Sequence, residues 1–305
     1  MLDAVTGAFS FSGRAIARRL VEEGHEVVTL IRRTPDRDPF DGAVRMALVD
    51  LADPATLLPA LQDVDTLYNT HWIRFPRGGL TYETAIAHTR NLVSAAREAG
   101  VRRLVHLSVV NAAESSPTPY FVAKARLEAE VKAMGVSHAI VRPTMTFGPG
   151  DILVNNLCWV LRRFPAFAVP GDGRFRLQPV HVDDVAAIAV TAGQRTEDLT
   201  LDAAGPEVLA FDDFVRILAR AVDRRPWLVH APPLLSLVAS RLLGLLVNDI
   251  LLTRDEVTEL TSSLLVSSQS PLGTTRISEW APANAGLLGR AYHSELARHY
   301  RVRGP

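Results

Sequence analysis

Tyr120 and Lys124 stand four residues apart and are the side chains in this sequence best suited to move a proton. Thr118-Pro119 before them is typical of a helix start, so the segment up to Met134 is expected to carry both on one face. A free tyrosine, with a pKa of about 10, is a poor acid or base at neutral pH, but a neighbouring ammonium group stabilises its phenolate. The pair therefore predicts a proton donor or acceptor, and the alternative is a chance helical spacing.

Residues 1–13 predict a strand, a turn containing glycine, and the start of a helix. Such a turn lets backbone N–H groups approach a pyrophosphate at the helix N-terminus, where the macrodipole favours negative charge. The middle position carries a serine, whose Cβ and hydroxyl come near the phosphates. We therefore expect a dinucleotide cofactor in contact with Gly7, Phe9, Ser10, Phe11 and Gly13.

The end of the next expected strand indicates which dinucleotide is bound. NAD-specific sites place a carboxylate there to bond the ribose hydroxyls. This chain has Leu30-Ile31-Arg32-Arg33 instead, and two guanidinium groups suit a ribose 2′-phosphate. NADP(H) is therefore favoured over NAD(H), and the alternative is a pair of solvated loop arginines.

Apolar runs alternate with helical patterns through the first half of the chain, which predicts βαβ units and a parallel sheet. Strands are expected at 26–31, 44–49, 66–69, 103–108 and 137–141, and helices at 14–23, 54–61, 80–99 and 119–134. The fold class is α/β, a Rossmann doubly wound parallel sheet with a smaller, mostly helical C-terminal substrate lobe. We place the NAD(P)-binding domain at 1–150 and the lobe at 151–305, with 176–203 returning to the sheet.

Two groups of residues are candidate substrate contacts. His71 and Trp72 follow the fourth strand, at the sheet edge where ligands bind in this architecture. They would hold an anionic or aromatic substrate, or Trp72 would simply cover the cofactor cleft. Asn155 and Asn156 lie on the helix expected at 153–163.

A third group, around residues 181–184, looks like a set of metal ligands. His181 is followed by Asp183 and Asp184, but no other ligand spacing supports a metal site. One of the two aspartates is better interpreted as the N-cap of the following helix. We expect no metal.

Composition narrows the classes of partner. Basic and acidic residues balance at 33 each, which gives no reason to expect nucleic acid. The single Cys158 fits a reducing compartment, and no leader precedes the first strand, so we expect a cytoplasmic protein. The longest apolar stretch, 234–247, is interrupted by Arg241 and is too short to span a bilayer.

That stretch forms a broad stripe at helical spacing, for which core packing is the favoured account. An oligomer interface or a contact with a membrane surface is the alternative, although Arg241 is the only cation on its polar face. The stripe contains Leu234, Leu235, Val238, Leu242, Leu245 and Leu246.

The order of motifs resembles the extended short-chain dehydrogenase/reductases over about residues 1–195. The motifs are Thr6-Gly7 with Gly13, Asp50-Leu51, Ser108, Tyr120-x-x-x-Lys124, Arg142-Pro143, Phe147-Gly148-Pro149 and His181-Val182-Asp183-Asp184-Val185. The stretch from Ser108 to Ala112 is similar to an atypical, epimerase-like branch that includes the nucleotide-binding accessory subunit of respiratory complex I.

The resemblance implies a cofactor site and a catalytic group. Asp50 and Leu51 would lie at the adenine, Pro143 beside the nicotinamide, and Lys124 at the ribose. Tyr120 would transfer the proton with Lys124 and Ser108. Besides Ser10, the chain departs from the family pattern with Val109 at the usual catalytic serine and Ala85 at the usual asparagine.

These observations leave two functions open. The first is an NADP(H)-dependent oxidoreductase or epimerase that acts on a small molecule through Tyr120 and Lys124. The second is a non-catalytic NADP(H)-binding accessory or redox-sensing protein of a larger assembly. A homodimer is equally compatible with the sequence.

Overall fold

The computed structural model describes residues 1–300, except the side chain of His299. It consists of two compact units: Met1–Pro143 with Val182–Ala203, and Thr144–His181 with residues 204–300. Residues 176–177 and 179–181 form strands that pair within the second unit, and the chain re-enters the first unit at Val182. In the described part of the chain, no helix is both long and apolar enough to cross a membrane.

The first unit is built on a seven-stranded sheet in the order β11-β6-β5-β4-β1-β2-β3, and every pairing is parallel. Its strands are β1 (Leu2–Thr6), β2 (Glu26–Ile31), β3 (Val44–Leu48), β4 (Thr66–Asn69), β5 (Arg103–Leu107), β6 (His138–Pro143) and β11 (Leu199–Ala203). This order confirms the Rossmann doubly wound sheet.

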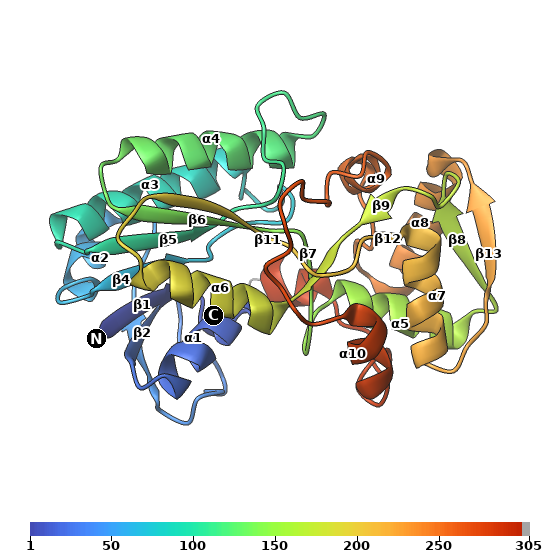
Figure 1. The fold of residues 1–305 in the computed structure, drawn as a ribbon, viewed down its shortest axis with the longest axis horizontal. Coiled ribbons are helices and arrows are strands. Elements are labelled where there is room, and N and C mark those ends of the chain that lie inside the picture. The colour runs from blue at the N-terminus through green and yellow to red at the C-terminus, as the bar shows by residue number, and fades with distance from the viewer. Residues whose placement is uncertain (301–305) are drawn as a thin grey trace. The chain divides into compact units, whose positions relative to one another are not determined.

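Helices cover both faces of this sheet (Figure 1). One face carries α1 (Phe11–Glu22) and α6 (Val182–Gln194), and the other carries α2 (Pro54–Ala60), α3 (Tyr82–Glu98) and α4 (Pro119–Ala133). Because both faces are covered, β4 and β5 are buried at every position. The buried positions of these two strands include polar side chains, Thr66 and Asn69 of β4 and Arg103 and His106 of β5.

The start of α6 differs from the expectation. The helix begins at Val182, so Asp183 and Asp184 lie in its first turn and neither is the N-cap. Two carboxylates in a first turn still interact favourably with the helix dipole, which accounts for their position without a cap or a metal.

The second unit combines helices with three two-stranded sheets. Its helices are α5 (Leu153–Arg163), α7 (Phe211–Ala221), α8 (Pro233–Val247), α9 (Arg254–Thr261), α10 (Ile277–Ala283) and a π-helical turn at Leu296–Tyr300. The paired strands are β7 (Met145–Phe147) with β10 (Pro179–His181), β9 (Arg176–Leu177) with β12 (Leu209–Ala210), and β8 (Ala166–Pro170) with β13 (Trp227–Ala231). Its core gathers aromatic side chains such as Phe147, Phe175, Phe211 and Phe214.

The apolar stripe on α8 is not in that core, so the expectation of core packing was wrong. Its six large side chains are exposed by 44 to 80%. The helix buries small residues instead, Ser236 and Gly244, and a Cβ on Gly244 would come within 2.6 Å of the Asp249 carbonyl oxygen. Because the close packing uses the small residues, the bulky ones face outward.

Candidate active site

The turn after β1 has the backbone shape of a phosphate-binding loop. Gly7 adopts a φ of +66°, which favours glycine. The backbone N–H of Ser10 donates to the Gly7 carbonyl oxygen at 2.8 Å, and the Ser10 hydroxyl donates to the same oxygen at 2.6 Å. The Ser10 hydroxyl therefore bonds within the turn, and the Ser10 side chain does not cap α1. The first N–H groups of α1 stay available to an anion.

Gly13 is the second fixed point of this turn. A Cβ at this position would lie 2.2 Å from the Gly7 carbonyl oxygen, a distance that no side chain tolerates. With glycine at position 13, helix α1 approaches the end of β1 more closely than a residue with a side chain would permit. The first turn also lacks an acidic residue, as an anion site requires.

Arg14 is a residue at this turn that we did not single out from the sequence. Its guanidinium donates to the Phe9 carbonyl oxygen at 2.9 Å. A cation in the first turn of a helix opposes the macrodipole, and this unusual placement is the sequence signal that could have singled out Arg14. Phe9 itself lies 6.1 Å from Phe40, between ring centroids, and Phe11 is the first residue of α1.

The carboxyl ends of β2 and β3 carry the next candidates. Arg32 and Arg33 are exposed, and neither guanidinium has a carboxylate partner among residues 1–300. One Asp50 carboxylate oxygen accepts from the Ala52 N–H at 2.9 Å, which fixes the turn after β3. The Leu51 carbonyl oxygen accepts from the Asn91 side chain at 3.0 Å, so α3 holds this turn in place.

Lys124 lies under an aromatic ring. Its ammonium donates to the Leu107 carbonyl oxygen at 2.9 Å, at the end of β5, and its Nζ lies 4.3 Å from the centroid of the Trp72 ring. Trp72 stacks on Tyr82, and its ring meets that of Tyr120 edge to face with centroids 6.1 Å apart. The structure therefore brings Trp72, Tyr120 and Lys124 together.

Burial changes the acid–base character of this lysine. The loss of hydration lowers the pKa of Lys124 to about 7, and Glu128 one turn later acts in the opposite direction. Glu128 is itself held by Arg142 through two hydrogen bonds of 2.9 and 2.5 Å. An amine with a pKa near neutrality holds or releases a proton at physiological pH.

A buried polar network lies beneath this cluster, and its hydrogen bonds fix the orientation of Asn69. The backbone N–H of His71 must donate, so the Asn69 atom 3.1 Å away is its oxygen. The Asn69 amide nitrogen therefore donates to His106 Nδ1 at 3.1 Å. His106 then carries its proton on Nε2, a buried atom without a partner in the described structure. Burial lowers the pKa of His106 well below its usual value, so the ring is neutral.

His71 contacts another histidine that the sequence analysis did not consider. Its Nε2 lies 3.4 Å from Nδ1 of His88 on α3. Burial, then the charges of His88, Lys124 and Arg32, lower the pKa of His71 to about 4. His71 is therefore a neutral hydrogen-bonding group near neutral pH. From the sequence, only the position of His71 after β4 indicates that it lies near the site, and nothing indicates its contact with His88.

The end of β5 supplies the serine. Ser108 is buried, and its hydroxyl has no hydrogen-bond partner among the described residues. Val109, at the usual catalytic position, is buried as well. Pro143 closes β6 next to this strand, where its carbonyl oxygen accepts from the Val110 N–H at 3.0 Å.

Asn155 and Asn156 lie in the second unit, where backbone groups occupy their amides. Asn155 donates to the Ala291 carbonyl oxygen and accepts from the Gly289 N–H, at 2.9 and 3.0 Å. Asn156 makes the same pair of bonds with His293, at 2.8 and 2.9 Å. These bonds anchor the segment 289–293 to α5.

His181 packs its ring against Phe147 and Trp280. Across residues 1–300, no group of three or more His, Cys, Asp or Glu side chains is placed to hold a metal ion.

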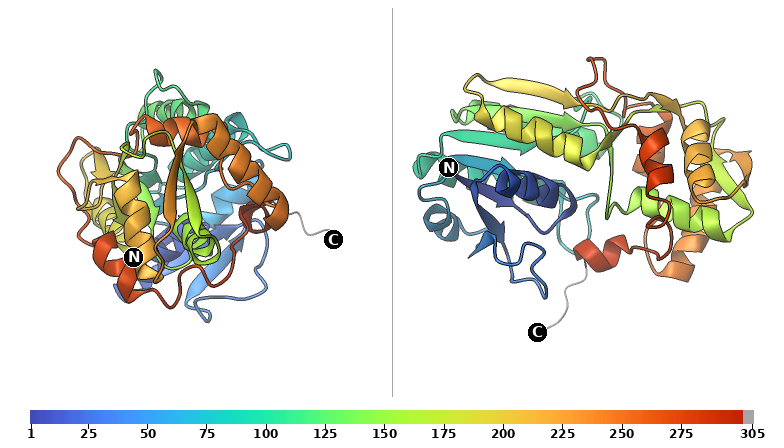
Figure 2. Two further views of the ribbon diagram at one scale, coloured as in Figure 1. Left: turned by 90° about the vertical axis from the view of Figure 1, so that its right-hand side faces the viewer. Right: turned by 60° about the horizontal axis from the view of Figure 1, so that its bottom comes forward.

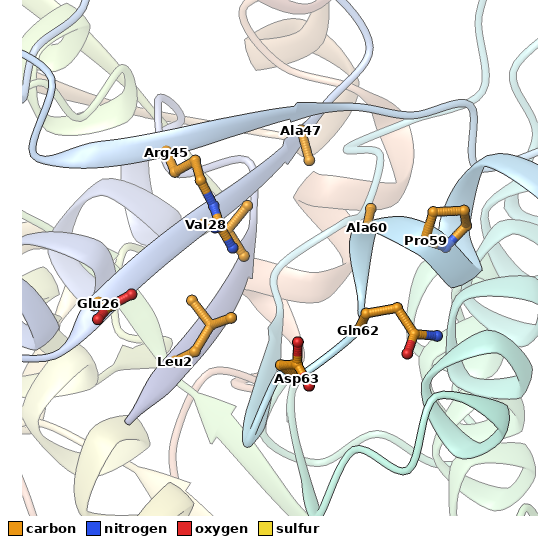
Figure 3. A pocket seen from close by; sticks show the side chains of 9 residues that line it. All are labelled: Leu2, Glu26, Val28, Arg45, Ala47, Pro59, Ala60, Gln62 and Asp63. Carbon is orange, nitrogen blue, oxygen red and sulfur yellow. The ribbon is translucent and has the colours of Figure 1, made fainter.

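A pocket of about 590 Å³ opens at the amino ends of the strands, opposite the edge that carries the candidate site (Figure 3). It lies at the first residues of β1 and β2, Leu2 and Glu26, between Arg45 of β3 and the end of α2 at Ala60. Ligands of open α/β sheets bind outside the carboxyl ends of the strands, so we assign this pocket no role in the site.

The residues present fit a dinucleotide. The space between Gly7 and Gly13 admits no side chain, the α1 N-terminus is uncapped, and the Ser108 hydroxyl lacks a partner. These features define an NAD(P)-binding Rossmann protein. The model of the NAD dependent epimerase/dehydratase family matches residues 4–201, and the chain belongs to this family. The resemblance to epimerase-like dehydrogenases is thereby confirmed.

Similar proteins include enzymes and a respiratory-chain subunit. The chain is 33% identical over 220 residues to sterol demethylase protein B of Methylococcus capsulatus, which covers 63% of this chain and 66% of that protein. It is 24% identical over 285 residues to the mitochondrial NADH dehydrogenase (ubiquinone) 1 alpha subcomplex subunit 9 of Arabidopsis thaliana, covering 87% and 71% of the two chains. The fold is similar to that of Citrobacter triphenylmethane reductase complexed with NADP(H), with a TM-score of 0.74, 20% identity, and coverage of 93% and 100%.

Proposed function

We propose that the protein is an NADP(H)-dependent oxidoreductase or epimerase, with Tyr120 as the general acid or base. The observation that carries this proposal is the position of Lys124, buried one helical turn after Tyr120 and bonded to the end of β5. A structural lysine is seldom buried with its charge. Burial of a lysine is expected where its charge adjusts the proton affinity of a neighbouring phenol, as in an active site.

The cofactor would be held by the residues at the carboxyl ends of the strands. The N–H groups of the turn from Gly7 to Gly13 would bind its pyrophosphate, with Phe9, Ser10 and Phe11 alongside. Arg32 and Arg33 would bind a ribose 2′-phosphate, since both are exposed and lack carboxylate partners in the described structure. Asp50 and Leu51 would lie at the adenine, and Pro143 beside the nicotinamide. When bound, this cofactor supplies or accepts a hydride.

The protein's own groups would manage the proton. The Tyr120 hydroxyl gives a proton to, or takes one from, the oxygen of the substrate. Lys124, when charged, stabilises the phenolate form of Tyr120 through its positive charge. Ser108 offers a second hydroxyl for the same oxygen, which would satisfy its unpartnered buried atom.

The substrate is a small molecule that contacts His71 and Trp72. The flat ring of Trp72 favours an apolar or aromatic surface, and the neutral His71 offers a hydrogen bond without a charge. The name of the Methylococcus relative refers to a sterol, and sterols are largely apolar molecules of the kind that a tryptophan ring would contact. The side-chain amides of Asn155 and Asn156 bond to the backbone of segment 289–293, so we propose no substrate contact for these two residues.

Replacing Tyr120 with phenylalanine tests the catalytic role. We expect turnover of apolar ketones with NADPH to fall by about a hundredfold or more, because positioned acid–base groups contribute on this scale. NADPH affinity should change little. Tyr82→Phe is the matched control, since its hydroxyl bonds the Arg74 carbonyl oxygen and its ring would still stack on Trp72. Equal turnover of the Tyr120→Phe variant and the parent chain would refute the assignment.

A second candidate is a non-catalytic NADP(H)-binding accessory protein. The Arabidopsis respiratory subunit aligns with 87% of this chain, and Val109 replaces the usual catalytic serine. This function predicts tightly bound NADP(H) that stays unchanged across a broad panel of carbonyl compounds, together with co-purifying partner proteins.

We place either function in the cytoplasm, on the evidence of the single buried Cys158.

A further inference from the structure

Helix α8 has the opposite arrangement of residues from a helix on the surface of a globular protein. A surface helix normally turns its apolar stripe inward. Here Leu245 and Leu246 are exposed by 79 and 80%, and Leu234 by 71%, whereas Ser236 and Gly244 are buried. Small residues toward the protein and large apolar ones outward are typical of helices that face lipid.

The neighbouring strand continues this apolar surface. Trp227 and Val229 of β13 are exposed by 78 and 50%, and they alternate with Leu228, which packs on the core of the second unit. The chain passes directly from β13 through Pro232 into α8, and the left view of Figure 2 shows this orange helix beside the pair β8 and β13. Half of the large apolar side chains exposed in the described structure belong to β13 and α8.

The segment from Arg224 to Asn248 carries formal charge of one sign, and the carboxylate that contacts β13 is that of Asp212, bonded to His230. From Arg224 to Asn248 the sequence contains three arginines, Arg224, Arg225 and Arg241, and no aspartate or glutamate. All three are exposed, and none is paired with a carboxylate within residues 1–300. Arg224 donates only to carbonyl oxygens, those of Arg162 and Asp223. Such a surface complements a partner that is apolar and negatively charged.

We infer that β13 and α8 bind the surface of an anionic phospholipid bilayer. The helix has 15 residues and is about 22 Å long, so it would lie in the plane of the interface and not span it. Trp227, with Arg224 and Arg225 just before it, would sit at the level of the lipid headgroups, where tryptophan and arginine are favoured. A second copy of the chain is a poorer occupant, because a two-fold interface would place the arginines of both copies in the same contact.

Co-sedimentation with vesicles tests this inference. We expect the parent chain to pellet with phosphatidylcholine vesicles that contain about 30 mol% phosphatidylglycerol, and to bind several-fold more weakly in about 0.5 M NaCl. The double variant L245Q/L246Q should partition about tenfold less. Leu287→Gln is the matched control: this leucine is 68% exposed in the same unit, and its substitution should leave binding unchanged.

Two further measurements make the test independent of folding and of the proposed enzyme activity. The fluorescence of Trp227 should shift to the blue on vesicles, and Trp227→Phe should lose that shift while still pelleting. The triple variant R224Q/R225Q/R241Q should lose its preference for anionic over neutral vesicles. The inference is overturned if the parent chain stays in the supernatant with both kinds of vesicle, or if it forms a dimer that L245Q/L246Q dissociates without vesicle binding. Because no arm uses cofactor or substrate, its failure would leave the proposed function untouched.

Discussion

The ammonium of Lys124 lies 4.3 Å above the Trp72 ring centroid while it donates a hydrogen bond to the Leu107 carbonyl oxygen. One side chain of α4 thereby links the loop that follows β4 to the last residue of β5. The ring excludes water from the ammonium but also attracts its charge, so Trp72 affects the pKa of Lys124 in two opposing ways.

Replacing Trp72 with leucine should raise the pKa of Lys124. The cation–π contact is worth about 0.5–2 kcal/mol. The burial that lowers this pKa from 10.5 to about 7 corresponds to roughly 5 kcal/mol, so even partial rehydration outweighs the lost contact. The chain has two lysines, Lys124 and the exposed Lys132, so an NMR titration of the lysine side chains follows Lys124 with an internal reference. An unchanged or lower pKa would contradict this explanation.

The same lysine should make folding stability depend on pH. Between the folded pKa of about 7 and the unfolded value of about 10.4, the unfolded chain binds the proton that the folded chain releases. Stability should therefore rise with pH across this window, by up to about 1.4 kcal/mol per pH unit. Urea unfolding of Lys124→Met should lack this rise. Parallel pH profiles for the variant and the parent would mean that Lys124 titrates normally in the folded protein.

Alanine at Gly13 should abolish dinucleotide binding. The added methyl group would lie 2.2 Å from the Gly7 carbonyl oxygen, so α1 must move away from the end of β1 and the turn must open. Gly286→Ala adds the same group where no atom lies within 4 Å, and it should bind NADPH like the parent chain. Isothermal titration calorimetry compares the two variants. Parent-like affinity in Gly13→Ala would exclude this turn as the pyrophosphate site.

Alanine at Arg32 and Arg33 should weaken NADPH binding about tenfold or more and leave NADH binding nearly unchanged. Charge-assisted bonds to a phosphate are worth about 1.5–3 kcal/mol, and NADH has no 2′-phosphate to receive them. Arg37→Ala, at another exposed arginine of the same loop, controls for general charge. Equal losses for both nucleotides would overturn the assignment of NADP(H).

The sheet could be predicted from the sequence because its strands alternate with segments of clear helical periodicity. Glu26–Ile31 and Thr66–Asn69 occur at the expected residues, as does the helix Leu153–Arg163. Glu26–Ile31 is a nearly continuous apolar run, and Thr66–Asn69, half of whose residues are polar, is recognisable from its place between two helical patterns. The short strands of the second unit, such as Arg176–Leu177 and Pro179–His181, have too few residues to show any period.

Orientation and neighbourhood could not be predicted in the same way. The stripe on α8 was visible as a pattern, but only the packing of Ser236 and Gly244 decides that it faces outward. His71 was a candidate from its position after β4, whereas its neighbour His88 lies on α3 and His106 on β5. Sequence position gave no reason to group these three histidines with Lys124.

The return of the chain at Val182 has a consequence for biosynthesis. A ribosome completes β6 and then Thr144–His181 of the second unit before it makes α6 and β11. Until then β6 is an open edge of the nascent sheet, and α1 lacks the helix that packs beside it. Open strand edges invite pairing with other chains, so this interval is when the newborn protein most needs a chaperone. A gene rearranged to encode α6 and β11 directly after β6 would shorten that interval.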